Sequence, residues 1–356
     1  MKLFKRFSCY CVLAAFLFAG CDDDEAGPQD EGNNDDQNDE QLYENGLFVI
    51  NEGNFQWGEG SVSFIDFADY SISNNIFNKA NGRVPGNVAN SFSIFNDSGY
   101  LVVNNSQIIE VVDPSTFEST GAIEGFNSPR HFKGVRENKA YVSDLYENAV
   151  YVVDPEENEI TGQINIDGWT EEMVLFDDKL FVGNMDNGSI VEISVTSDAV
   201  TGEIEVLAEP ASLVKDDQGN FWVLCTGGFE ETHPGLFKIN PEKGDVEKAF
   251  TFSEKEDSPS GLTYSASQQV FYYNNGNRIF KFDPEGELPG ELFLDLQGEF
   301  NVHSLQYIEQ SGHLILTDAK DYTSEGTVYK YDPATGERLE SWEAGVIPGY
   351  IEFYGE

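Results

Sequence analysis

Seven positions of similar chemistry recur along the chain, each near the end of a short apolar run. Asparagine or aspartate occupies six of them, and the amides and carboxylates of these residues can hydrogen-bond a ligand. The same residue types also end strands and tolerate turn conformations, so a purely geometric role is the alternative. The seven positions are Asn51, Asn104, Asp144, Asn184, Cys225, Asn274 and Asp318.

Basic and aromatic residues in neighbouring segments enlarge this candidate binding site. Arg130 is followed by His131, and the planar guanidinium of an arginine grips carboxylate, amide or phosphate oxygens. A salt bridge within this acidic chain is the alternative role for Arg130. Aromatic rings on loops supply stacking area, and nearby amides fix the orientation of a ligand. The further candidate contacts are Asn54, Trp57, Asn90, Tyr146, Trp169, Met185, Phe229, His303, Tyr322 and Tyr350.

The sequence offers little support for catalysis or for a resident metal. It contains no GxSxG elbow, no HExxH pair and no Walker loop. His131 and His303 could ligate a metal, but the four histidines are not paired in the sequence. Cys225 follows the apolar run FWVL, which indicates packing and not nucleophilic chemistry. We therefore expect no catalytic residue, no metal and no cofactor, in a protein that is not an enzyme.

The segments that carry these residues belong to a sevenfold repeat. Each copy has an apolar strand, a polar loop and a second strand that ends in Asp-Pro or a relative, as in GYLVVNNSQIIEVVDPSTF and GHLILTDAKDYTSEGTVYKYDPATG. The spacings between successive copies are 47, 41, 40, 46, 43 and 49 residues. They are measured between Asp66, Asp113, Asp154, Ser194, Asn240, Asp283 and Asp332. This period is that of a four-stranded propeller blade.

Short apolar strands also precede and follow the copies, as in HSLQYI and GEIEVL, and turn residues separate them. The sequence therefore predicts an all-β fold, a seven-bladed β-propeller of four-stranded antiparallel blades. In such a ring, the loops that carry the candidate residues open on one face. An open solenoid or a pair of β-sandwiches is the alternative fold.

The two ends of the repeat region predict how the ring closes. The first copy lacks an upstream strand, because an acidic segment precedes Gly46. The chain ends in IPGYIEFYGE, which matches the missing strand. We therefore predict that residues 348–354 pair with residues 46–51, which removes two exposed sheet edges. The propeller domain is expected to span residues 46–356.

The first 45 residues predict export and a tether. Residues 1–20 combine a basic start, an apolar run and two small residues, which is typical of a signal peptide. The ending before Cys21 resembles a bacterial lipobox, which implies cleavage there and lipidation of Cys21; an ordinary signal peptide is the alternative. Residues 21–45 hold eleven acidic residues and no lysine or arginine, so we expect a disordered acidic tether.

The charge of the chain limits its partners. The formal net charge is −44, and binding to nucleic acid needs a basic surface, so nucleic acid is excluded as a partner. The same charge argues against a protein that lies flat on an anionic membrane. Membrane attachment is then expected through the lipid alone. Of the four cysteines, only Cys225 would stay free in the processed chain, so no disulfide framework is expected.

The repeat region resembles a family of surface lipoproteins. The resemblance rests on LFVINEGN at residues 47–54, followed by GSVSFIDF, NSFSIFNDSGYLVVNNSQIIEVVDPSTFE and SPRHFKGVRENKAYVSD, and it covers residues 46–356. The chain is similar to the corrinoid-binding BtuG lipoproteins of the Bacteroidota and to the broader YncE-like or YVTN-repeat propellers. The acidic residues after Cys21 also resemble the surface-export signal of Bacteroidota lipoproteins.

This resemblance implies a capture protein anchored in the outer membrane by its lipid and facing the cell exterior. It implies that a corrinoid (vitamin B12), or a similar bulky nutrient, is bound and passed to a TonB-dependent outer-membrane transporter. We expect a monomer outside that complex; a lipoprotein facing the periplasm is the alternative. Two other functions stay open: a lactonase-like or lyase-like propeller enzyme with a metal at His131 or His303, and a module that docks a polysaccharide or another surface protein.

Overall fold

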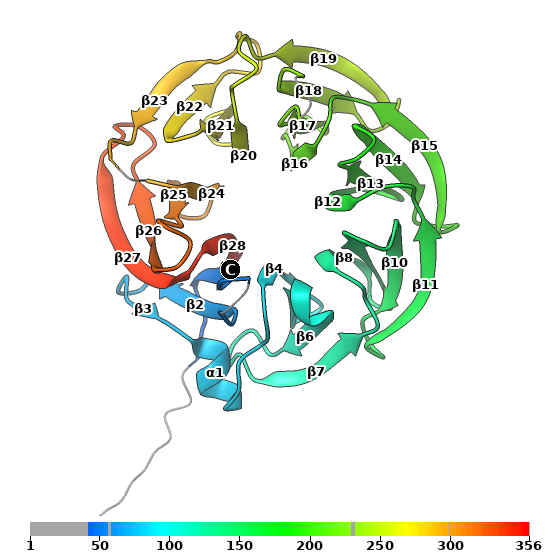
Figure 1. The fold of residues 1–356 in the computed structure, drawn as a ribbon, viewed down its shortest axis with the longest axis vertical. Coiled ribbons are helices and arrows are strands. Elements are labelled where there is room, and N and C mark those ends of the chain that lie inside the picture. The colour runs from blue at the N-terminus through cyan, green and yellow to red at the C-terminus, as the bar shows by residue number, and fades with distance from the viewer. Residues whose placement is uncertain (1–41, 56–57, 229–231, 299, 356) are drawn as a thin grey trace, which may run out of the picture. The chain divides into compact units, whose positions relative to one another are not determined.

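A computed structural model describes residues 42–55, 58–228, 232–298 and 300–355 of the chain. These residues form seven four-stranded antiparallel sheets, arranged as blades around a central axis (Figure 1). The predicted all-β, seven-bladed propeller is thus confirmed. The signal peptide, Cys21 and the tether up to residue 41 lie outside the described residues, as do the candidate contacts Trp57 and Phe229.

In every blade four strands lie side by side, named below from the innermost to the outermost. Blade 1 contains β28 (Pro348–Tyr354), β1 (Gly46–Asn51), β2 (Ser61–Asp66) and β3 (Ile72–Ser73). Blade 2 contains β4 (Ala89–Phe95), β5 (Ser98–Val103), β6 (Ile108–Val112) and β7 (Ser119–Glu124). Blade 3 contains β8 (Pro129–Arg136), β9 (Lys139–Asp144), β10 (Ala149–Asp154) and β11 (Glu159–Asn165). Blade 4 contains β12 (Thr170–Phe176), β13 (Lys179–Asn184), β14 (Ser189–Ser194) and β15 (Ala199–Glu205).

The remaining three blades repeat this order. Blade 5 contains β16 (Pro210–Lys215), β17 (Phe221–Cys225), β18 (Gly235–Asn240) and β19 (Asp245–Thr251). Blade 6 contains β20 (Pro259–Ser265), β21 (Val270–Asn275), β22 (Arg278–Phe282) and β23 (Glu291–Asp295). Blade 7 contains β24 (Val302–Ile308), β25 (His313–Asp318), β26 (Glu325–Tyr331) and β27 (Arg338–Val346).

The C-terminal strand closes the ring as predicted. β28 pairs antiparallel with β1, with Tyr354 opposite Gly46 and Pro348 opposite Asn51. Blade 1 is therefore built from both ends of the propeller sequence. Because β28 covers the inner edge of β1, neither strand is left with an unpaired ladder there.

The core is divided among the seams between neighbouring blades. In the described chain, buried apolar residues form seven clusters, and each draws on two adjacent blades. The seam between blades 7 and 1 joins Leu47 and Val49 to Ile315 and Val328. A middle strand faces a neighbouring blade on both sides, which explains why β1 reads as the unbroken apolar run LFVI.

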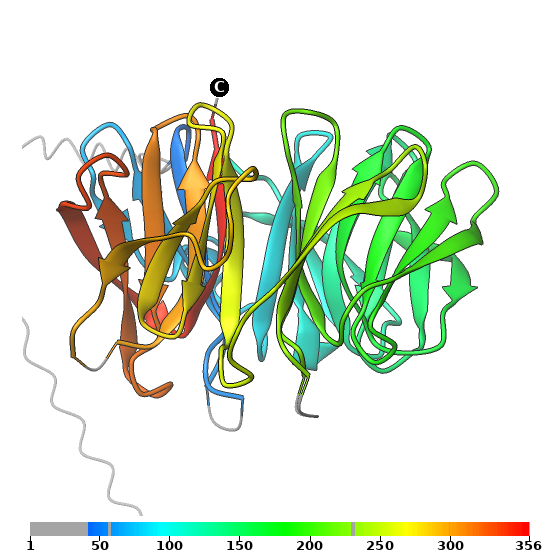
Figure 2. The ribbon, with the colours of Figure 1, turned by 90° about the horizontal axis from the view of Figure 1, so that it is seen from above.

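The Asp-Pro turns between the third and fourth strands form as their chemistry predicts. The Asp154 Oδ1 atom accepts a hydrogen bond from the backbone N–H of Glu156 at 3.0 Å, and Asp283 binds the N–H of Glu285 at 2.9 Å. Each carboxylate thus caps its own turn two residues later. These turns lie on the face opposite the hairpins between the second and third strands, and Figure 2 shows the strands running between the two faces.

Blade 1 departs from the repeat. Its outer strand β3 has only two residues, and the helix α1 (Ile76–Asn81) follows at once; the repeat pattern did not predict this helix. Ile76 and Phe77 are buried in the seam between blades 1 and 2.

A short 3-10 helix, η1 (Asn104–Ser106), lies between β5 and β6. Among the described residues, no helix is both long and apolar enough to cross a membrane.

Candidate functional site

The innermost strands share an irregularity that aims side chains at the axis. In the described chain, all seven of them shift register against their neighbour close to their first residue. In β4, for example, Ala89 pairs with Val103 and Ser91 with Val102, so Asn90 has no partner in the ladder. Such a bulge bends the strand and re-aims the extra side chain, and bulges are common next to functional sites. We call the channel opening that these bulges surround the mouth.

The bulges around the mouth carry two unlike kinds of residue. Polar or charged side chains occupy the bulges of β4, β8, β12 and β24, whereas alanine, glycine or leucine occupies those of β16, β20 and β28. The polar bulge residues are Asn90, Arg130, His131, Glu171, Glu172 and His303. In the bulge of β28, a Cβ on Gly349 would come within 2.4 Å of the Glu52 carboxylate. This glycine therefore leaves room for a charged side chain at the mouth.

Glu171 is the centre of a hydrogen-bonded network that joins the bulges of β8 and β12. Arg130 Nε donates to its two carboxylate oxygens at 2.8 and 3.0 Å, and Trp169 Nε1 donates to Oε1 at 2.8 Å. His131 Nε2 lies 3.5 Å from Glu171 Oε2. Burial alone would raise the pKa of Glu171, but Arg130 and His131 outweigh it and hold that pKa below its usual range. Arg130 thus forms a salt bridge with Glu171, which is the alternative role that the sequence leaves open for it.

A second pair lies where blade 7 meets blade 1. His303 Nε2 and Glu52 Oε1 are 2.8 Å apart, and the ring of Tyr322 stands edge-on to that of His303 at 6.1 Å. Asn54 Nδ2 donates to the backbone carbonyl of Tyr322 at 3.2 Å. The hairpin loop after β1 is in this way joined to the corresponding loop of blade 7.

Below the mouth, the channel opens into a cavity of about 540 Å³. Lys133, Glu172, His303 and Tyr350 line it, and Glu352 follows two positions after Tyr350 in β28. Burial raises the pKa of Glu352 to about 7, with Lys133 acting against this shift. Burial also raises the pKa of Glu172, opposed by His131 and Lys133. A carboxyl group that titrates near neutrality beside an ammonium group can accept, hold and return a proton.

The predicted ring of amide and carboxylate groups lies inside the protein. Asn51, Asn104, Asp144, Asn184, Cys225, Asn274 and Asp318 are all buried. Asp144 Oδ2 accepts hydrogen bonds from the backbone N–H groups of Asn127 and Ser128 at 3.1 and 2.7 Å, and Asp318 Oδ1 accepts one from Asn301 at 2.8 Å. Asp144 and Asp318 thus hold the loop before the innermost strand of their own blade, and Asn104 Nδ2 reaches the next blade, donating to the carbonyl of Pro129 at 3.0 Å. We therefore do not include this ring among the contacts proposed below.

The strand pairing also refines the predicted alignment by one residue. The first residue of each innermost strand pairs with the residue that the alignment sought to identify. In blade 2 Ala89 pairs with Val103 and not with Asn104, and in blade 6 Pro259 pairs with Asn275 and not with Asn274. Cys225 does occupy this position, opposite Pro210. Burial raises the pKa of the Cys225 thiol to about 12, which agrees with the predicted packing role.

The remaining candidates divide between the mouth and its rim. Asn90, Arg130, His131, Trp169, His303 and Tyr350 belong to the mouth and are partly buried. Tyr146 and Tyr322 stand on hairpin loops of the same face and are 69% and 45% exposed. Met185 is partly buried, and its N–H donates to the carbonyl of Trp169 at 2.9 Å. Phe55, beside Asn54, is 66% exposed and adds a third ring to this rim.

Sequence reasoning missed five charged residues of the channel. They are Glu52, Lys133, Glu171, Glu172 and Glu352. In a chain with 64 acidic residues, single carboxylates do not stand out. A usable signal was their position, because TEEMVLF and YIEFY place charges inside short strands that are otherwise apolar. In the described chain, no group of three or more His, Cys, Asp or Glu side chains could hold a metal ion.

Comparison with solved structures shows the same fold in proteins of different function. A quinoprotein alcohol dehydrogenase-like protein from Bacteroides thetaiotaomicron has a TM-score of 0.69 at 15% identity, over 88% of this chain and 79% of that one. Hydrazine synthase of Kuenenia stuttgartiensis has a TM-score of 0.61 at 10% identity, over 73% and 88%. Dihydro-heme d1 dehydrogenase NirN, in complex with DHE, has a TM-score of 0.57 at 9% identity, over 86% and 75%.

These structures correct one expectation. The expectation that the protein is not an enzyme rests on the absence of catalytic motifs, and it is contradicted because hydrazine synthase and the dehydrogenase NirN share this propeller fold. At 9 to 15% identity the likeness concerns the fold alone, so no activity is carried over to this chain.

Comparison at the level of sequence gives a family without an assigned activity. No curated protein matches the chain. Residues 45–341 match a domain of unknown function, DUF5074, and this match spans nearly the whole propeller. The chain therefore belongs to the DUF5074 family.

Proposed function

We propose that this protein captures a bulky, amide-bearing small molecule at the mouth, with a corrinoid as the leading candidate. The observation that carries the proposal is the row of bulges, which turns charged and amide side chains toward one opening above a cavity of about 540 Å³. Small-molecule sites of roughly 300–1,000 Å³ are common in proteins. The opening is therefore of a size and polarity suited to such a ligand.

The chemistry of the mouth complements a broad ligand with apolar and amide parts. The exposed rings of Phe55, Tyr146 and Tyr322 offer contact area on the rim. The Nε2 atoms of His131 and His303 face Glu171 and Glu52, and Asn90 Nδ2 donates to the carbonyl of Arg130 at 2.7 Å. The Nδ1 atoms of the two histidines and the Oδ1 atom of Asn90 are the groups that can bond a ligand around the opening. A ring whose seams are all packed keeps this surface preformed, so little ordering cost opposes binding.

The cellular part of the proposal rests on the N-terminal sequence. We place the protein on the outer membrane, held by lipid on Cys21 and facing outward, because of the lipobox-like ending and the acids that follow it. In this position the propeller passes its ligand to a TonB-dependent outer-membrane transporter. The similarity of residues 47–54 to corrinoid-binding lipoproteins favours this role.

The test is an equilibrium titration of the purified protein with cyanocobalamin. We expect one-to-one binding, and we expect Tyr146→Ala and Tyr322→Ala each to weaken it about five- to tenfold, as the loss of about 1 kcal/mol of ring contact predicts. Tyr146 is 69% exposed and Tyr322 45% exposed, and neither belongs to a core cluster of the described residues, so neither change should disturb the fold. Leu292→Ala is the control, because Leu292 is 49% exposed on the outer strand β23. Absence of saturable binding, or equal affinity in all variants, would contradict the proposal.

A further inference from the structure

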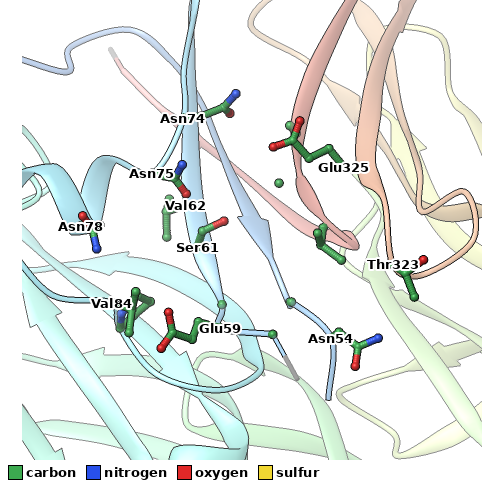
Figure 3. Close-up of a pocket in the computed structure, with 17 residues that line it drawn as sticks. Asn54, Glu59, Ser61, Val62, Asn74, Asn75, Asn78, Val84, Thr323 and Glu325 are labelled. Carbon is green, nitrogen blue, oxygen red and sulfur yellow. The ribbon is translucent and has the colours of Figure 1, made fainter. Parts of the chain in front are cut away.

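A second cavity lies beside the loop after β1, at the edge of blade 1. It has a volume of about 650 Å³ and adjoins the seam with blade 7. We call it the seam pocket and define it by Asn54, Glu59, Asn75, Asn78, Thr323 and Glu325. Figure 3 shows Asn75 and Asn78 on one side and Thr323 and Glu325 on the other, with Ser61 and Val62 between them.

The seam pocket exists because blade 1 departs from the repeat. β3 ends after two residues, and the chain then turns through Asn75, with φ 58°, into α1. Asn74, Asn75 and Asn78, which directly follow this short outer strand, line the pocket. The repeat explains no part of this arrangement, which makes the pocket a feature of this blade alone among the described residues.

Hydrogen bonds made by lining residues hold the walls of the seam pocket in place. The N–H of Gly53 donates to the carbonyl of Val346 at 3.0 Å, and the N–H of Gly60 donates to that of Gly86 at 2.7 Å. Asn74 Nδ2 donates to the carbonyl of Glu343 at 3.0 Å. The loop after β1 is thus fixed at both ends, and the pocket is formed before any ligand arrives.

Four exposed side chains of this pocket have hydrogen-bonding groups that no other described residue engages. Within the described part of the chain, Glu59, Asn75, Asn78 and Glu325 make no side-chain hydrogen bond or ion pair. Together they offer two carboxylates, which accept, and two amides, which both donate and accept. Val62, Val84 and Val346 add an apolar surface to the lining. This mixture suits a ligand with many hydroxyl groups on a partly apolar ring.

The charge of the lining narrows the ligand class. The described residues that line the seam pocket include the carboxylates of Glu59 and Glu325 but no lysine or arginine. An anionic ligand would meet two carboxylates in a chain of net charge −44. From this combination of cavity, free amides and carboxylates we infer that the seam pocket binds a neutral saccharide.

The seam pocket and the mouth are separate sites. Asn54, whose side chain donates to the Tyr322 carbonyl, stands at their border, and no other residue that defines the seam pocket belongs to the mouth. The saccharide inference therefore does not depend on the function proposed for the mouth. One molecule of each ligand can be bound at the same time.

The inference can be tested by ligand-observed NMR on the purified protein. The probes are cellobiose, chitobiose, maltose and lactose, with glucuronate as the anionic comparison. We expect saturable binding of at least one neutral disaccharide and none of glucuronate. The double variant Glu59→Gln/Glu325→Gln should weaken binding at least fivefold, because it replaces two strong acceptors by amides, and Asn78→Ala should weaken it in the same direction.

The control is the charge-matched double variant Glu156→Gln/Glu157→Gln, in the exposed turn after β10 on the opposite face. It should bind the disaccharide as the unchanged protein does. Lack of binding by all four neutral probes would overturn the inference, as would equal affinity in the Glu59/Glu325 variant. Displacement of the sugar by cyanocobalamin would overturn the separation of the two sites, whereas failure of cyanocobalamin to bind at all would bear only on the mouth.

Discussion

At the scale of single residues, the charged groups around the axis divide into those that hold the fold and those that are free to act. Arg130 belongs to the first kind, since its guanidinium neutralises the buried carboxylate of Glu171. Removing one partner of a buried ion pair costs about 3–5 kcal/mol, so a substitution of Arg130 would test stability before it tested binding. The exposed rings of Tyr146 and Tyr322 are the cleaner probes of the mouth.

Glu352 belongs to the second kind and makes the stability of the protein depend on pH. Its pKa is raised by burial from the ordinary 4.5 to about 7. Between these values the folded protein keeps a proton that the unfolded chain has lost, so this group's contribution to stability falls as pH rises through the window. Above pH 7 the ionised carboxylate stays in the channel and the cost is fully present.

Glu352→Gln should remove that cost. We expect the variant to gain about 2 kcal/mol in the free energy of unfolding at about pH 8.5, and close to nothing at about pH 5, by denaturant titration. The exposed Glu157→Gln serves as control and should show no such difference between the two pH values. A Glu352→Gln variant that is equally stable, or less stable, at the higher pH would show that the carboxylate is well solvated or paired.

The candidate residues also show where sequence reasoning about a site reaches its limit. Asn51 and Asp144 were correctly placed at strand ends, but the pattern could not tell a ligand-facing amide from one that fastens two loops. That distinction depends on which backbone N–H groups lie within reach of the side chain. These groups come from loops about 17 residues away in sequence, as Asn127 does for Asp144.

At the scale of elements, the bulges of the innermost strands decide what faces the axis. A one-residue offset leaves almost no trace in a short apolar run, and the pattern aligned Asn104 and Asn274 one position from their structural equivalents. Helix α1 was missed for a related reason. Its two buried residues, Ile76 and Phe77, are too few to set a helical period.

The closing strand β28 should contribute to stability as much as a strand within a continuous blade. Ile351 is 2% exposed in the seam of blades 7 and 1, and Leu262 is 6% exposed in the seam of blades 5 and 6. We expect Ile351→Ala and Leu262→Ala each to lower the free energy of unfolding by about 2–4 kcal/mol in denaturant titrations. A loss below about 1 kcal/mol for Ile351→Ala alone would mean that β28 is only loosely joined to the ring.

At the scale of the whole molecule, the repeat carried most of the information. A period set by Asp-Pro turns, together with a missing first strand and a matching last one, was enough to predict seven blades and the pairing of β28 with β1. The fold alone does not identify the function, because propellers of this shape include enzymes as well as members of a family without an assigned activity. What distinguishes this chain is the charge and shape of its channel and of the seam pocket.

The most direct test of the central claim is a crystal structure of the protein with cyanocobalamin bound. We predict that the ligand lies over the mouth, within contact distance of Tyr322 and His303 on one side and of Asn90 and His131 on the other. Ligand density on the opposite face, at the Asp-Pro turns, or a protein that crystallises without ligand from saturating cyanocobalamin, would contradict the assignment of the mouth as a corrinoid site.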